Sequence, residues 1–89
     1  DKNQENAPKQ KPQKMTYKDK RELDQLPKKI EKTEATITEL KELLADADLY
    51  ARDPDKFHAA VKALAETEAK LERYELRWLE LSEAAEKLA

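Results

Sequence analysis

Two stretches of the chain repeat mostly apolar residues at spacings that alternate between three and four, which is the period of coiled-coil helices. The first stretch repeats at Leu23, Leu26, Ile30, Thr33, Ile37, Leu40, Leu44 and Ala47. The second repeats at Phe57, Val61, Leu64, Glu68, Leu71, Tyr74, Trp78, Leu81, Ala85 and Leu88, with two successive spacings of three at Leu71. Such a slip in register is typical of a stammer. The pattern predicts two long helices that each bury one narrow stripe.

Helix boundaries are indicated by capping residues and prolines. Thr16 suits an N-cap, with the acidic Asp19 in the first turn behind it. Pro27 suits the first position of a helix better than its interior, and the pair Asp53–Pro54 suits a second helix start. A single first helix that is kinked at Pro27 remains the alternative. The elements expected within the domain at 15–89 are a short helix 16–26, a long helix 27–48, a loop 49–53 and a long helix 54–88.

The two long helices pair best when they run antiparallel. One constant offset then sets Leu40 near Leu64, Thr33 near Leu71 and Leu26 near Trp78. Leu76 and Leu79 widen the apolar face of the last helix, which indicates that the short helix packs there. The expected fold is therefore all-α: an antiparallel two-helix coiled-coil hairpin, monomeric, with a short N-terminal helix packed at its root.

Length and composition restrict the function classes. The 89 residues allow one small domain and start with Asp rather than Met, so we interpret the chain as a piece of a longer protein. Residues 1–14 are polar with two prolines, which predicts a disordered basic linker. Gly and Cys are absent, which excludes glycine-rich phosphate loops and thiolate metal sites. No apolar run is long enough for a signal peptide or a membrane span.

Charge is distributed unevenly along the chain. Residues 1–32 hold ten Lys and Arg against six Asp and Glu, whereas residues 33–72 hold five against ten. In a hairpin this makes the root basic and the tip acidic. A basic surface beside a basic arm is typical of phosphate binding. The candidate nucleic-acid contacts are Lys9, Lys11, Lys14, Lys18, Lys20, Arg21, Lys28, Lys29, Lys32, Arg73 and Arg77.

Catalytic and metal-binding chemistry is not indicated. His58 has no second His and no Cys beside it, so we expect no metal site and no cofactor. The carboxylates lie on exposed faces, where Glu66 and Lys70 form an ordinary i,i+4 pair. Tyr17 and Trp78 could stack on bases, but aromatic residues at seam spacing more often belong to the core.

Several short stretches resemble the C-terminal domain of ABC-F ATP-binding cassette proteins of the Uup type. They are Lys14-Met15-Thr16-Tyr17, Arg21-Glu22-Leu23, Leu26-Pro27-Lys28-Lys29-Ile30, Asp48-Leu49-Tyr50, Asp53-Pro54 and Arg73-Tyr74-Glu75-Leu76-Arg77-Trp78-Leu79-Glu80-Leu81. The resemblance implies a cytoplasmic parent with two ATP-binding cassettes, followed by a coiled-coil hairpin associated with DNA binding. It implies structural roles for Tyr17, Leu26, Pro27 and Trp78. Thr33 departs from the family, which tends to place leucine there.

Two hypotheses of function follow. The first is a non-catalytic module that binds nucleic acid, DNA more than RNA, on behalf of an ATPase parent. The second is a protein-interaction arm that contacts the ribosome or the parent's own cassettes, using Leu49 and Tyr50 at the acidic tip. The simpler interpretation of these two residues is a cap that closes the end of the hairpin.

Overall fold

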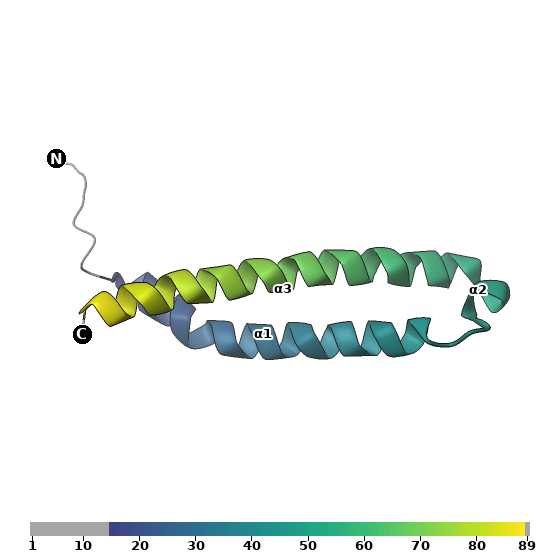
Figure 1. Cartoon of the computed structure of the whole chain (residues 1–89), viewed down its shortest axis with the longest axis horizontal. Coiled ribbons are helices and arrows are strands. Elements are labelled where there is room, and N and C mark those ends of the chain that lie inside the picture. Colours follow the sequence, from purple (N-terminus) through teal and green to yellow (C-terminus); the bar gives the residue numbers. More distant parts are fainter. Residues whose placement is uncertain (1–14, 89) are drawn as a thin grey trace.

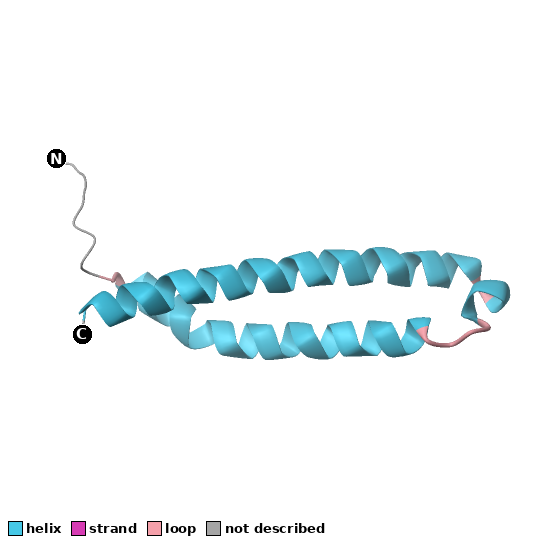
Figure 2. Cartoon of the chain, viewed as in Figure 1, coloured by secondary structure: helices cyan, strands magenta, loops and turns pink. Residues whose placement is uncertain are grey.

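The computed structural model describes residues 15–88, and these form a helical hairpin (Figure 1). Helix α1 spans Tyr17–Leu44, the single-turn helix α2 spans Leu49–Arg52, and helix α3 spans Pro54–Leu88. Helices α1 and α3 lie side by side and run antiparallel, with α2 at the turn between them. Figure 2 shows that helix makes up nearly all of the described chain, with loop only at the beginning and around α2. The predicted all-α hairpin is confirmed.

Helix α1 begins where its N-cap predicts. The Oγ1 atom of Thr16 accepts a hydrogen bond of 3.0 Å from the backbone N–H of Asp19, and this satisfies one of the donors that a helix leaves unpaired at its start. Asp19 stands in the first turn, where a carboxylate interacts favourably with the helix dipole.

Pro27 lies inside α1, so the predicted division into a helix at 16–26 and a helix at 27–48 is wrong. The kinked continuous helix, which the sequence left open, is the one that forms. Figure 1 shows α1 bending within its first third, so that its beginning passes behind the end of α3. A proline removes one backbone hydrogen bond and crowds the preceding turn, which bends a helix without having to end it. The residues that the sequence assigned to a separate short helix form the bent first segment of α1.

The tip is more ordered than the predicted loop 49–53. Helix α1 ends at Leu44 rather than at residue 48, and Leu49–Arg52 forms α2. A backbone turn is held by Asp46, whose Oδ1 accepts from the N–H of Asp48 at 3.0 Å and whose Oδ2 accepts from Arg52 Nη2 at 2.8 Å. Because Leu49 is 0% exposed, it closes the end of the hairpin as the simpler interpretation predicted.

Helix α3 begins at Pro54, as the sequence predicts, behind Asp53. The Oδ1 atom of Asp53 accepts a hydrogen bond of 3.1 Å from the N–H of Lys56. One turn later the ring of Phe57 meets the ring of Tyr50 edge-on, with centroids 5.2 Å apart. This contact ties α2 to α3.

The seam of α3 differs from the predicted one at three positions, one of which is Leu88, 43% exposed at its end. Val61 is 45% exposed and Glu68 is exposed, whereas Ala60 is buried and Thr67 is half-buried. The spacing therefore alternates between three and four without interruption along Phe57, Ala60, Leu64, Thr67, Leu71, Tyr74, Trp78, Leu81 and Ala85. The predicted stammer at Leu71 is wrong. Apolar size alone favours Val61 over Ala60, but the smaller Ala60 fits between closely packed helices.

Three further apolar positions lie outside the core. Leu76 and Leu79 are exposed, so the expectation that the N-terminal segment packs on them is wrong: this segment contacts Arg77 and lines a hollow with Ala85 and Leu88. Ala47 is also exposed, since it follows the end of α1. In the seam of α1, Leu26, Thr33 and Ile37 are buried as predicted. No helix among the described residues is both long and apolar enough to cross a bilayer.

Candidate nucleic-acid interface

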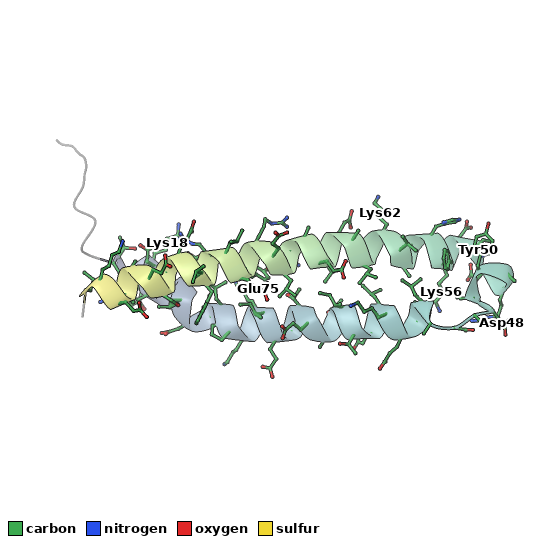
Figure 3. All side chains as sticks on the ribbon, in the orientation of Figure 1. Lys18, Asp48, Tyr50, Lys56, Lys62 and Glu75 are labelled. Atoms are coloured by element: carbon green, nitrogen blue, oxygen red, sulfur yellow. The ribbon has the colours of Figure 1, made fainter. Side chains whose placement is uncertain are left out.

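Most of the predicted basic residues that the structure describes lie at one end of the hairpin. Lys18, Lys20, Arg21, Lys28 and Lys29 belong to the first half of α1, Lys32 lies just past its middle, and Arg73 and Arg77 belong to the second half of α3. Figure 3 places Lys18 at the end where α1 begins, and Asp48, Tyr50 and Lys56 at the opposite end. Residues 1–14, with the predicted disordered linker and Lys9, Lys11 and Lys14, lie outside the described residues.

The two sides of the helix pair differ in chemistry. One side holds a groove of about 270 Å³ that is lined by Lys29, Lys32, Thr33, Thr36, Thr67, Lys70 and Tyr74. Another hollow, of about 540 Å³, is lined by Pro27, Ile30, Glu75, Trp78 and Leu79. Successive helix residues are about 100° apart around the axis. Positions 30 and 75 therefore point away from positions 29 and 74, and the two hollows open on opposite sides.

The polar groove continues toward the beginning of α1. A neighbouring hollow of about 440 Å³ is lined by Tyr17, Lys18, Arg21, Glu22, Gln25 and Lys29, so Lys29 is common to both. The cations that line these two hollows form what we call the basic face: Lys18, Arg21, Lys29, Lys32 and Lys70. None of the five forms an ion pair with another residue of the described range 15–88.

Two tyrosines accompany the cations of the basic face. The guanidinium carbon of Arg21 lies 6.0 Å from the ring centroid of Tyr17, and Nζ of Lys29 lies 5.8 Å from that of Tyr74. Both distances are within the range of a cation–π attraction. Because Tyr17 is 75% exposed, the expectation that it belongs to the core is wrong. Trp78 is 41% exposed and lines the apolar hollow, so it is only partly a core residue.

Arg77 is engaged by carboxylates of the chain itself and does not belong to the basic face. Its Nε and Nη2 donate to the two carboxylate oxygens of Glu22 at 2.9 and 3.0 Å. Nη2 also lies 3.5 Å from Asp19 Oδ1, and Nη1 lies 3.2 Å from Glu80 Oε1. The hydrogen bonds to Glu22 raise the pKa of Arg77 above its ordinary value, and the guanidinium lowers the pKa of Glu22. With three carboxylates around it, Arg77 is placed to hold α1 against α3.

Besides Arg77, three predicted cations (Lys20, Lys28 and Arg73) do not line the hollows of the basic face, and one lysine that was not predicted does. Lys20 lines a hollow with Met15, Leu23, Asp24, Ala85 and Leu88, away from the basic face. Lys70 belongs to the basic face, although sequence reasoning treated it as half of a surface pair with Glu66. Within residues 15–88 that pair is not formed. The antiparallel pairing of Thr33 with Leu71 was the signal that could have placed Lys70 beside Lys32 and Thr36.

Lysine ammonium groups along one side of a rod can neutralise phosphates without reading bases. Among residues 15–88 no group of three or more His, Cys, Asp and Glu side chains is arranged to hold a metal ion. The arrangement is therefore suited to contacting a charged polymer along its length.

Comparison with known proteins decides the family. A family model described as the ABC transporter C-terminal domain matches residues 14–83. The chain belongs to this family. The C-terminal domain is 47% identical over 70 residues to two proteins of Haemophilus influenzae, "ATP-binding protein Uup-like" and "ATP-binding protein Uup". It is 48% identical over 83 residues to "ATP-binding protein Uup" of Caulobacter vibrioides.

The C-terminal domain is much shorter than these relatives. The matches cover 79%, 79% and 93% of this chain but only 15%, 11% and 14% of the relatives. The similarity supports a C-terminal domain of the Uup type of ABC-F protein, an appendage of an ATP-binding protein. No solved structure matches the chain.

Proposed function

We propose that this C-terminal domain binds nucleic acid, DNA in preference to RNA, through the phosphates that meet its basic face, and so localises a cytoplasmic ATPase. One observation carries the proposal: five cations from two helices gather on one side and form no ion pair within the described chain. Cations that are not held in an ion pair by a carboxylate of the described chain can attract an external polyanion.

The proposed contacts determine what kind of binding to expect. Lysines act as point charges that hold a backbone without selecting a base sequence. We therefore expect micromolar or weaker affinity that tolerates any sequence. If about three to five phosphates are neutralised, the slope of log K against log salt should be near −3 to −4.

A salt titration with charge-matched variants tests the proposal. The test variant carries Lys18→Glu, Lys29→Glu and Lys32→Glu, all on the basic face. A control with Lys41→Glu, Lys56→Glu and Lys62→Glu changes the net charge equally but alters lysines of the tip half, of which Figure 3 labels Lys56 and Lys62. We expect the test variant to lose binding to a duplex oligonucleotide and the control to retain most of it. Binding that ignores salt, or that both variants weaken equally, would refute the proposal.

A second candidate is a protein-interaction arm, and the apolar hollow favours it. Since Leu49 is fully buried, the tip offers only Tyr50 of the two residues first considered. Exposed apolar side chains lie instead toward the root, where Trp78 and Leu79 line the hollow and Leu76 is also exposed. A ribosomal protein or the ATP-binding part of the same protein could cover them. Leu79→Ser should then weaken that contact and leave affinity for DNA unchanged.

A further inference from the structure

The floor of the polar groove is made of two threonines at seam positions. Thr33 is 8% exposed and Thr67 is half-buried, at places where leucine would fill the space between the helices. Their hydroxyls turn back to their own helices, with Thr33 Oγ1 donating to Lys29 O and Thr67 Oγ1 donating to Ala63 O, each at 2.6 Å. The small side chains leave the hollow of about 270 Å³ open, and their hydroxyl protons are already used.

The rim of the groove is built from lysines of both helices. Lys29 and Lys32 come from α1 and Lys70 comes from α3, and none of them pairs with a carboxylate within residues 15–88. Like charges around one hollow repel each other, and a bound anion relieves this repulsion. The ring of Tyr74 holds Nζ of Lys29 on the groove side at 5.8 Å, which limits where that ammonium can go.

We propose that this groove is a specific binding site for one backbone phosphate of a bound nucleic acid, which Lys29, Lys32 and Lys70 contact. We call this site the phosphate seat. This inference rests on the proposed function and adds a position to it. The bound strand would extend from Lys18 and Arg21 at the root to the middle of the rod, and Lys70 belongs to the segment 33–72 in which acidic residues outnumber basic ones. Lys70 becomes a contact residue that the charge distribution along the chain does not reveal.

Two test substitutions and one control distinguish a shaped phosphate site from a general positive field. Lys70→Gln removes one rim charge, and Lys62→Gln removes the same charge from an exposed position of α3 that does not line the groove. Thr33→Leu fills the floor and changes no charge at all. Duplex oligonucleotide affinity is measured by fluorescence anisotropy over a range of salt concentrations, with helical content checked by circular dichroism.

The seat predicts a distinct result for each variant. Lys70→Gln should weaken binding roughly fivefold to tenfold at 0.1 M salt and reduce the salt slope by about 1, as expected for one lost phosphate contact. Lys62→Gln should leave the affinity and the salt slope nearly unchanged. Thr33→Leu should weaken binding even though it does not change the net charge. Equal effects of Lys70→Gln and Lys62→Gln, or full binding by a folded Thr33→Leu variant, would overturn the seat.

Titrations with small phosphate compounds show whether the groove binds the phosphate of a strand or a free phosphate compound. Inorganic phosphate and ATP are titrated alone and as competitors of the oligonucleotide. The seat predicts only weak competition, because each supplies one local contact without the neighbouring phosphates of a strand. If ATP bound through Lys70 while the Lys70→Gln substitution left the affinity for the oligonucleotide unchanged, the groove would be a nucleotide site and the proposal would be wrong. If the chain binds no nucleic acid, both the proposed function and the phosphate seat are refuted. If the chain binds nucleic acid but the variants bind with unchanged affinity, only the phosphate seat is refuted.

Discussion

Arg77 of α3 donates two parallel hydrogen bonds to Glu22 of α1, at 2.9 and 3.0 Å, although 55 residues separate them in the chain. The contact exists because α1 bends within its first third and brings its beginning against the end of α3. It connects the bent segment, which carries Lys18 and Arg21 of the basic face, to the straight helix that carries Lys70. The geometry of the proposed interface therefore depends on this ion pair.

Breaking the pair should loosen the root more than it destabilises the whole hairpin. Arg77→Leu removes every contact with Glu22, Asp19 and Glu80, but these groups are partly exposed, and exposed ion pairs contribute little to stability. We expect a decrease in Tm of only a few degrees. Amide hydrogen exchange in residues 17–26 should become faster, with exchange near the tip unchanged. Unchanged protection of residues 17–26 would show that apolar packing alone holds this segment.

Stability should fall in acid because two carboxylates have lowered pKa values. Hydrogen bonds from Arg77 lower the pKa of Glu22, and those from Arg52 and the Asp48 backbone lower the pKa of Asp46. The folded state therefore binds fewer protons than the unfolded state. The stabilising contribution is complete above the unfolded pKa, about 4, and is lost as pH falls through the folded pKa. Urea unfolding from pH 6 to pH 2 should show this loss, and Glu22→Gln should reduce it.

Thr33→Leu should raise stability while it closes the polar groove. Leucine adds apolar atoms at a position that is 8% exposed, and each buried CH₂ contributes about 0.8 kcal/mol. Loss of the hydroxyl should cost little, because its acceptor, the carbonyl of Lys29, lies inside a helix, where carbonyls accept backbone hydrogen bonds. Tm, measured by circular dichroism, should rise by roughly 4–8 °C for a gain of about 1 kcal/mol. A lower Tm would mean that the groove cannot accept the larger side chain.

Leu49→Ala tests whether α2 is part of the core. Leu49 is fully buried, so truncation leaves a cavity at the tip and should cost about 2–5 kcal/mol. The matched control Leu76→Ala truncates an exposed leucine of α3 and should change stability by about 0.5 kcal/mol or less. Equal destabilisation by both variants in urea titrations would contradict the role assigned to Leu49.

Sequence patterns were sufficient where local chemistry decides the structure. The cap at Thr16 and the pair Asp53–Pro54 mark the helix starts correctly, and the alternating spacing predicts an antiparallel hairpin. The response of a helix to Pro27 depends on what the next turn packs against, which no local signal contains. The choice of Ala60 over Val61 depends on how closely the helices approach. Counting apolar size alone therefore gave the wrong register.

The candidate site was predictable in its location but not in its members. The charge distribution indicated a basic root, and the structure brings Lys18, Arg21, Lys29 and Lys32 together on one side of α1, from the root to the middle of the rod. Counting charge along the chain could not show that Arg77 is already paired, because its partners lie on the other helix. Lys70 was missed for the opposite reason, since its neighbour in sequence was assumed to be its partner in space.

An NMR titration of the chain with duplex DNA, single-stranded DNA and RNA of equal length tests the central claim most directly. Amide and side-chain signals report which residues meet the ligand. The account predicts shifts in residues 17–36 of α1 and 67–74 of α3, largest with duplex DNA, and none in residues 46–58 at the tip. No shifts with any of the three, or shifts confined to the tip, would contradict it.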